Sequence, residues 1–340
     1  MEISPQTRAL LADAVICDML VPDAPAPLLP GVGRLFEPHV MRFERAGVTF
    51  ASFTAGLDHV ASIETQVKTL AMARRYFLTR PERFILVKCA EDIRRAKRER
   101  KLAVNFNFQG TNSLLGDLHL VEVYRALGVG HMLMAYNEKN LVGDGCHERT
   151  DAGLSLFGIR LVHEMNRVGM LVDVSHTGYR TSMEVLEVAK APVIFSHSGP
   201  RALHDHERNV RDDQLTACAA TGGVIGVTGV GLFMSAGGMD ISAQILIRQI
   251  DYIAGLVGAR HVGFGLDHVE DVAYLAALIA GDDGRYPDKG GYKSAPQLLF
   301  ASPEIIPEVA EGLLRRNYSE EDVRGVLGEN WLRVMSKVWG

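Results

Sequence analysis

Short apolar runs of strand type alternate with longer stretches of helical period along this chain of 340 residues. Apolar strands that alternate with helices indicate a parallel sheet whose two faces are both covered. The helical patterns include 63–79, 118–127, 158–167, 181–189, 212–220 and 243–256. The strand candidates are 14–20, 48–55, 84–90, 102–109, 131–136, 170–176, 192–198, 223–229 and 261–268.

Eight strand–helix units are enough to close a barrel, so one candidate is in excess. The run 84–90 is left out, because only about a dozen residues separate it from the next run and a crossover needs at least that many. The sequence therefore predicts one α/β domain over 1–340, a (β/α)₈ TIM barrel. Residues 303–339 are expected to form C-terminal helices, with Ser319 as an N-cap. The polar stretch 282–301 is expected to be a long loop over the barrel mouth.

Composition and charge limit the kinds of molecule that this chain is expected to bind. The net charge is −5, and the densest basic run, RRAKRERK at 94–101, is typical of a solvated helix face, so no nucleic acid is expected. The scattered cysteines form no CxxC motif and indicate neither a disulfide framework nor a zinc finger. The N-terminus lacks the apolar segment of a signal peptide, and no apolar run reaches membrane-spanning length. The expectation is a cytoplasmic protein with no membrane segment.

Polar residues end five of the predicted strands, at the rim where a barrel of this kind places its active site. They are Gln109, Tyr136, His176, His197 and Asp267. Taken singly, a strand-end histidine is more often a satisfied core residue, and an aspartate more often a helix N-cap. Two neighbouring strands that both end on histidine change this balance, because their imidazoles converge and, with a facing carboxylate, suit Zn²⁺.

Two loops would lie above this rim. The first, 140–155, is rich in glycine and contains Cys146, His147 and Glu148. The second, 198–215, contains Arg208 and Asn209 just before a predicted helix start. Two interpretations of Arg208 stay open: a residue of a hydrated loop, or a guanidinium that holds a substrate carboxylate through two parallel hydrogen bonds.

The block GLSLFGIRLVHEMNRVGMLVDVSHTGYRTSMEVLEVAKAPVIFSHSGPRALHDHERNVRDDQL, at 153–215, resembles the membrane (renal) dipeptidases of the amidohydrolase superfamily. The segments AVICDML, LGVGHMLMAYN, HVGFGLD and LLRRNYSEEDVRGVLGENWLRVM are also similar to that family. The resemblance implies a (β/α)₈ barrel with two bridged zinc ions that hydrolyses dipeptides, including some with a D-residue at the C-terminal side. It also implies that two copies can pair as a homodimer.

The resemblance assigns roles by position. His176 and His197 match the two histidine ligands of one zinc. Arg208 matches the arginine that holds the substrate carboxylate. Asp267 matches the aspartate beside the metals that serves the attacking water.

The chain also departs from the family pattern. The family's first strand ends in Asp-Gly-His-Asn-Asp, whose His and second Asp bind the other zinc, whereas the corresponding segment here, DMLVP at 18–22, has Leu20 and Pro22 at those places. The bridging glutamate falls at Gln109, and a substrate-contacting histidine falls at Tyr136. These changes predict one divalent metal ion, zinc by preference, and leave the second in doubt. Substitute ligands for it would have to come from Cys146, His147 or Glu148.

The predicted function is therefore a metal-dependent hydrolase of a dipeptide or small amide that has a free carboxylate. His176 and His197 hold the metal, Asp267 completes the ligand set or acts as general base, and Arg208, Tyr136, Asn137 and Gln109 orient the substrate. The alternative is a barrel that binds an amino-acid-like ligand without hydrolysing it. Metal content distinguishes the two.

Overall fold

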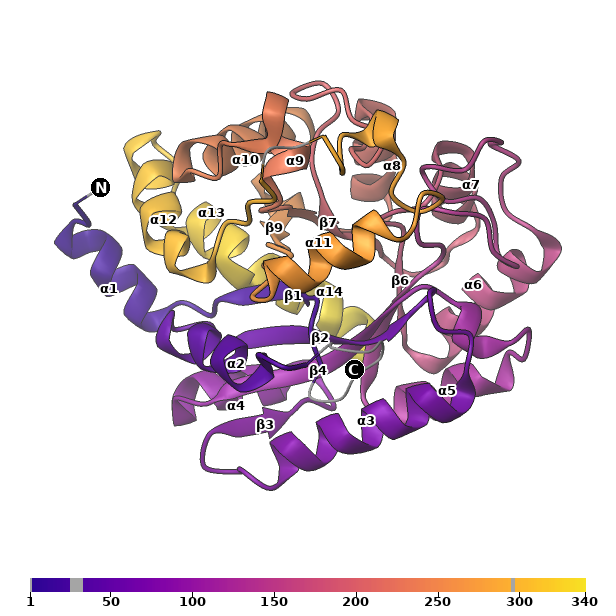
Figure 1. The fold of residues 1–340 in the computed structure, drawn as a ribbon. Coiled ribbons are helices and arrows are strands. Elements are labelled where there is room, and N and C mark those ends of the chain that lie inside the picture. Colours follow the sequence, from indigo (N-terminus) through magenta and orange to yellow (C-terminus); the bar gives the residue numbers. More distant parts are fainter. Residues whose placement is uncertain (1, 25–32, 295–296) are drawn as a thin grey trace.

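A computed structural model describes residues 2–24, 33–294 and 297–340 of the chain. Its strands form one parallel sheet in the order β2-β1-β9-β8-β7-β6-β5-β4-β3, and a further pairing of β2 with β4 closes the sheet into a barrel (Figure 1). The strands are β1 Cys17–Val21, β2 Phe50–Leu57, β3 Phe84–Leu86, β4 Leu102–Gln109, β5 Val129–Leu133, β6 Leu171–Asp173, β7 Val193–Ser198, β8 Ile225–Val227 and β9 Val262–Phe264. The predicted (β/α)₈ TIM barrel is confirmed.

The run at 84–90 differs from the prediction. Its first three residues form β3, which pairs in parallel with β4 through Phe84 and Leu102. Because β4 also pairs with β2, the ring closes without β3, which lies at its edge. The ten-residue helix Ala90–Glu99 fits into the connection between β3 and β4, so this short connection is long enough for a crossover. The exclusion was right for the barrel ring and wrong for the strand itself.

Helices alternate with the strands and cover the outside of the barrel (Figure 1). They are α1 Pro5–Asp13, α2 Phe36–Arg45, α3 Ile63–Leu78, α4 Ala90–Glu99, α5 His119–Ala126, α6 Leu156–Val168, α7 Tyr179–Val188, α8 Asp212–Ala220, α9 Gly231–Met234, α10 Ala243–Val257, α11 Val272–Ala280, α12 Ile306–Arg315, α13 Glu320–Arg324 and α14 Asn330–Trp339. Among the residues described, no helix has both the length and the apolar content needed to cross a bilayer.

The C-terminal region is helical, as predicted, from Pro303 onward. Ser319 is the N-cap of α13, and its side chain accepts a hydrogen bond from the backbone N–H of Asp322. Helix α14 closes the amino-terminal end of the barrel: Trp331 is fully buried, and its indole N–H donates to the carbonyl of Phe264 at 3.2 Å. The opposite, carboxyl-terminal end is thereby left for the loops that carry polar residues.

The basic run at 94–101 lies on α4 and in the turn after it. Arg94 pairs with Glu329 at 2.8 Å, and Arg98 pairs with Glu91 at 2.8 Å. These guanidinium groups therefore meet carboxylates of the same chain, as expected for a solvated helix face.

Candidate active site at the carboxyl rim of the barrel

The predicted site residues come from the carboxyl-terminal ends of five strands. Gln109 ends β4, Tyr136 and Asn137 follow β5, and His176 follows β6. His197 is the next-to-last residue of β7, Asp267 follows β9, and Arg208 lies between β7 and α8. Parallel strands bring these ends to one rim, so residues more than 150 positions apart in the sequence belong to one site.

The two histidines face each other directly. The Nε2 atoms of His176 and His197 are 2.9 Å apart, and both side chains are buried. The Nδ1 of His176 lies 2.6 Å from the amide oxygen of Asn137, and the Nδ1 of His197 lies 2.7 Å from the hydroxyl of Ser196. Burial, together with the charge of Arg208, holds the pKa of both imidazoles well below its usual range, so both rings are neutral.

The proton arrangement of this pair fits a cation. An amide oxygen can only accept, so His176 donates its Nδ1–H to Asn137 and turns the lone pair of Nε2 toward His197. If His197 donates its Nδ1–H to Ser196, its own Nε2 lone pair also points into the gap, and two lone pairs converge. Two neutral imidazoles whose other nitrogens are held by hydrogen bonds are a usual donor set for Zn²⁺. The opposite tautomer of His197 makes an ordinary hydrogen bond to His176 instead.

Three residues of the site have left-handed backbone conformations: Asn137, His176 and Asp267, with φ angles of 61°, 62° and 56°. Such angles are uncommon for residues with a Cβ, least so for Asn and Asp, and cost of order 1 kcal/mol or more each. Three such residues at one rim indicate that the positions of their side chains, rather than a low-energy backbone conformation, determine this geometry.

A buried polar network supports the histidines from below. Asp173, the last residue of β6, accepts hydrogen bonds from the backbone N–H groups of Ser175 and Ser196 at 3.0 and 3.1 Å. Its second oxygen lies 3.1 Å from Nδ1 of His131 on β5. Burial alone would raise the pKa of Asp173, but the hydrogen bond and charge of His131 and the hydrogen bond from Ser196 lower it to about 2. One carboxylate thus ties β5, β6 and β7 together beneath the site.

Arg208 is 2% exposed and lies against the histidine pair. Its Nη2 donates to the carbonyl of His197 at 2.7 Å, and its Nη1 donates to the hydroxyl of Ser198 at 3.2 Å. Its Nε is buried and has no hydrogen-bond partner among residues 2–24, 33–294 and 297–340. A buried guanidinium with an unused N–H is suited to a carboxylate of a bound molecule, which is the functional interpretation of Arg208.

Tyr136 stacks on His176, with ring centroids 4.0 Å apart and an interplanar angle of 21°. The stack forms a wall between two cavities. One, of about 300 Å³, is lined by His176, Arg208 and Cys146. The other, of about 100 Å³, is lined by Tyr136, Gln109 and Pro22.

Gln109 makes its side-chain contact on the neighbouring strand β2, away from the histidine pair. Its amide nitrogen donates to the hydroxyl of Thr54 at 3.1 Å, and its side chain lines the smaller cavity. Leu20 is fully buried and Pro22 lines the same cavity, so neither supplies a ligand atom. Asp18, which the family pattern also contains, uses Oδ1 to accept the backbone N–H groups of Leu20 and Leu266. At the two first-strand positions where the family has its ligands, Leu20 and Pro22 therefore offer no side-chain ligand atom.

Asp267 faces the same interior. Burial and the negative charge of Asp18 raise its pKa to about 7, against the opposing charge of Arg208. Among the described residues, the group of three or more His, Cys, Asp or Glu side chains whose ligand atoms all lie within 4.8 Å of one another consists of His39, His268 and Glu270. The Asp267 carboxylate does not belong to it. Asp267 as a direct metal ligand therefore stays a prediction, and a role through water suits its position equally.

The substitute ligands in the loop 140–155 divide into two groups. Cys146 reaches the site, and its thiol donates to the Asn137 oxygen at 3.3 Å, but burial raises its pKa to about 12. His147 is instead held by Glu207 at 2.8 Å and by the hydroxyl of Tyr292 at 2.9 Å. Glu148 accepts the backbone N–H groups of Lys139 and Arg149. Among the described residues, these three side chains do not come together in one group of ligand atoms.

Sequence reasoning missed the tyrosines that cover the site. The hydroxyl of Tyr286 lies 3.2 Å from that of Tyr136 and 3.3 Å from Nε2 of His59. Tyr286 and Tyr292 belong to the stretch expected to lie over the mouth, and their contacts with Tyr136 and His147 agree with that expectation. The signal was the aromatic content of this polar stretch, but nothing in its spacing indicates which tyrosine points inward.

The fold and the rim together define a (β/α)₈ barrel of the metallo-hydrolase kind, with an imidazole pair at the carboxyl ends of neighbouring strands. Residues 38–281 match the family model described as membrane dipeptidase, peptidase family M19. The chain belongs to this family.

Relatives and solved structures agree with this membership. The chain is 34% identical over 257 residues to an uncharacterized dipeptidase of Schizosaccharomyces pombe, a match that covers 74% of this chain and 57% of that protein. It is 30% identical over 259 residues to dipeptidase verJ of Clonostachys rogersoniana, covering 76% of this chain and 61% of that protein. The crystal structure of an amidohydrolase from Pseudomonas aeruginosa superposes with a TM-score of 0.85 at 31% identity, covering 98% and 99% of the two chains. The chain thus spans about three fifths of the two curated relatives.

Proposed function

We propose that this protein hydrolyses the amide bond of a dipeptide, or of a closely similar small amide with a free carboxylate, with one divalent cation held by His176 and His197. The observation that carries the proposal is the buried pair of neutral imidazoles with facing Nε2 atoms, beside a buried arginine that has an unused Nε–H. The dipeptidase names of the two curated relatives support the same reaction class.

Residues of the chain itself bind the substrate, transfer the proton and exclude bulk water. Arg208 binds the substrate carboxylate through its guanidinium and fixes the scissile amide relative to the rim. A carboxylate oxygen of Asp267 accepts the proton of the attacking water and passes it to the leaving amine, as the new C–O bond forms and the C–N bond breaks. A pKa of about 7 suits a group that both accepts and returns a proton near neutral pH. Tyr136 and the stacked His176 exclude bulk water from one side.

Zn²⁺ is the preferred cation for two imidazoles and a nearby carboxylate. Bound there, it supplies a Lewis acid that polarises the carbonyl and lowers the pKa of a water to about 7. The absence of donors at Leu20 and Pro22 supports one cation at this rim rather than two.

The test combines metal content with turnover. Wild-type protein is assayed against a panel of L,L- and L,D-dipeptides, and compared with His176→Ala and with His261→Ala, a matched change of a buried histidine at the opposite end of β9. We expect His176→Ala to abolish turnover and to lose the rim cation, whereas His261→Ala retains both. A protein that binds a dipeptide with neither metal nor hydrolysis would instead be the amino-acid-binding barrel. A homodimer and a cytoplasmic location remain predictions, which light scattering and cell fractionation test.

A further inference from the structure

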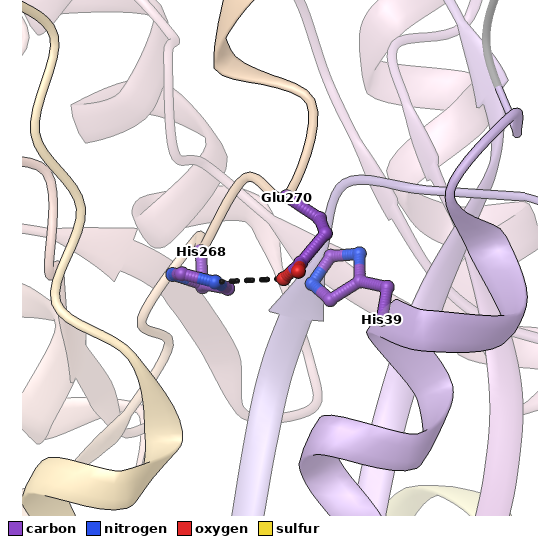
Figure 2. Close-up of side chains that lie close together, drawn as sticks. All are labelled: His39, His268 and Glu270. Atoms are coloured by element: carbon purple, nitrogen blue, oxygen red, sulfur yellow. Dashed lines mark hydrogen bonds and ion pairs between the residues drawn. The ribbon is translucent and has the colours of Figure 1, made fainter.

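A second cluster of ligand-type side chains lies apart from the histidine pair. His39 comes from α2, and His268 and Glu270 come from the segment after β9 (Figure 2). One ligand atom from each lies within 4.8 Å of the others. Figure 2 shows the Glu270 carboxylate between the two imidazole rings. Two imidazoles and one carboxylate are the donor set of many zinc sites.

The hydrogen bonds of His39 leave one nitrogen unused. Its Nδ1 lies 3.2 Å from a carboxylate oxygen of Asp23, and since a carboxylate only accepts, Nδ1 carries the proton. In the neutral ring Nε2 then presents a lone pair, and among the described residues it has no hydrogen-bond partner, on a side chain that is 1% exposed. A buried acceptor with no donor costs of order 1–3 kcal/mol. A histidine whose far nitrogen is held by a carboxylate, with its near nitrogen free, is the usual arrangement of a metal-ligating histidine.

His268 and Glu270 show a matching arrangement. The Nε2 of His268 lies 3.3 Å from Oε2 of Glu270, and Nδ1 of His268 is buried and has no hydrogen-bond partner in the part of the chain that the structure describes. A separation of 3.3 Å is long for an N–H···O hydrogen bond. It is close to the distance of roughly 3.4 Å between two ligand atoms that share one tetrahedral ion at bonds of about 2.1 Å.

The surrounding charges favour a divalent cation. Glu270 also receives two hydrogen bonds from Arg42, at 2.8 and 3.2 Å, and Arg42 reaches Glu304 at 2.7 Å. The three carboxylates of Asp23, Glu270 and Glu304 outnumber the guanidinium of Arg42, which leaves two negative charges near the two imidazoles.

We infer that His39, His268 and Glu270 bind a structural cation, Zn²⁺ by donor type, at a second site that is separate from the rim pair. The bound ion links α2 to the segment that follows β9, residues 229 positions apart in the sequence. Because β1 pairs with β9, this is the seam where the first and last strands of the barrel meet. The ion stabilises barrel closure beside Asp267 and takes no direct part in hydrolysis.

The test removes the rim pair first, so that the two sites are counted separately. The double variant His176→Ala/His197→Ala is stripped with a chelator, dialysed against ZnCl₂ and analysed for zinc by mass spectrometry. We expect about one zinc per chain, together with a rise in the midpoint of thermal unfolding on adding ZnCl₂. Introducing Glu270→Gln into this variant lowers the zinc content to background and abolishes the thermal shift.

Glu304→Gln in the same background is the matched control, because Glu304 also pairs with Arg42 but lies outside the cluster. It retains the zinc and the thermal shift. His39→Gln, which keeps a polar side chain of similar reach, gives an independent removal of one ligand, and circular dichroism checks its folding. A double variant that binds no zinc, or a Glu270→Gln protein that binds as much as the Glu304→Gln protein, overturns the inference. Either result is independent of whether the wild-type rim pair binds metal or hydrolyses dipeptides.

Discussion

Replacement of Asp173 by asparagine tests whether the network beneath the site supports the barrel. The Asp173 carboxylate is fully buried and accepts N–H groups from Ser175 and Ser196, while its other oxygen meets His131. Asparagine keeps the volume but removes the charge, and it places an N–H₂ group where an oxygen now accepts. Its remaining oxygen can still accept from Ser175 and Ser196, but the contact with His131 on β5 loses its carboxylate acceptor.

The expected cost follows from the pKa of this group. A fall from the reference value of 3.8 to about 2 means that the native state favours the charged carboxylate by on the order of 2 kcal/mol. We therefore expect Asp173→Asn to lower the free energy of unfolding at pH 7 by about 2–3 kcal/mol. Since the folded-state pKa is depressed, this stabilisation is complete above pH 4 and is lost as the pH falls toward 2. The difference between wild type and variant shrinks over the same range.

Urea unfolding followed by the fluorescence of the two tryptophans measures this free energy between pH 8 and the acid limit of folding. Asp205→Asn is the matched control, because that carboxylate is 81% exposed and bonds only at the surface to Arg201. We expect the control to stay within about 0.5 kcal/mol of wild type. A difference below about 1 kcal/mol for Asp173→Asn at pH 7, or one that grows as the pH falls below 4, would refute the reasoning.

Three further outcomes are expected. Asn137→Leu removes the acceptor that orients His176 and should weaken zinc binding at the rim by about 10- to 100-fold in a competition titration, whereas Leu at the exposed Asn317 should not. Arg208→Lys should raise KM for dipeptides by about 10- to 100-fold, and should leave amidated dipeptides, which lack the carboxylate, at their already poor wild-type KM. Chelator treatment should abolish hydrolysis and added ZnCl₂ should restore it; loss without restoration by any divalent cation would contradict the metal-dependent mechanism.

The barrel could be predicted because its signal is repeated. Each buried parallel strand needs a continuous apolar run, and each crossover needs a helix, so the period alone indicates the architecture. The ends of strands are less well determined by this signal. The run 170–176 forms a strand only over Leu171–Asp173, because Asp173 turns its carboxylate to the backbone of the next strand instead of continuing the ladder.

The histidine pair could be predicted for the same reason, since strand order brings neighbouring strand ends together. The loop residues could not. His147 and Cys146 are adjacent in sequence, yet one bonds Glu207 and the other bonds Asn137. Which of them reaches the site depends on contacts with residues far along the chain, and no local pattern encodes these. The cluster of His39, His268 and Glu270 was missed because its members come from α2 and from a loop, not from strand ends.

The segment after β9 connects the two sites. Asp267 and His268 are consecutive, and in an extended strand they would point to opposite faces of the sheet. Here Asp267 lies three residues beyond the end of β9 and has a left-handed backbone, with φ of 56°, and the ring of His268 packs against that of His39. A cation on His268 would restrain this turn and with it the position of Asp267. The structural cluster and the proposed proton acceptor are therefore coupled through one peptide unit, so loss of zinc at His39 should loosen the rim before it unfolds the barrel.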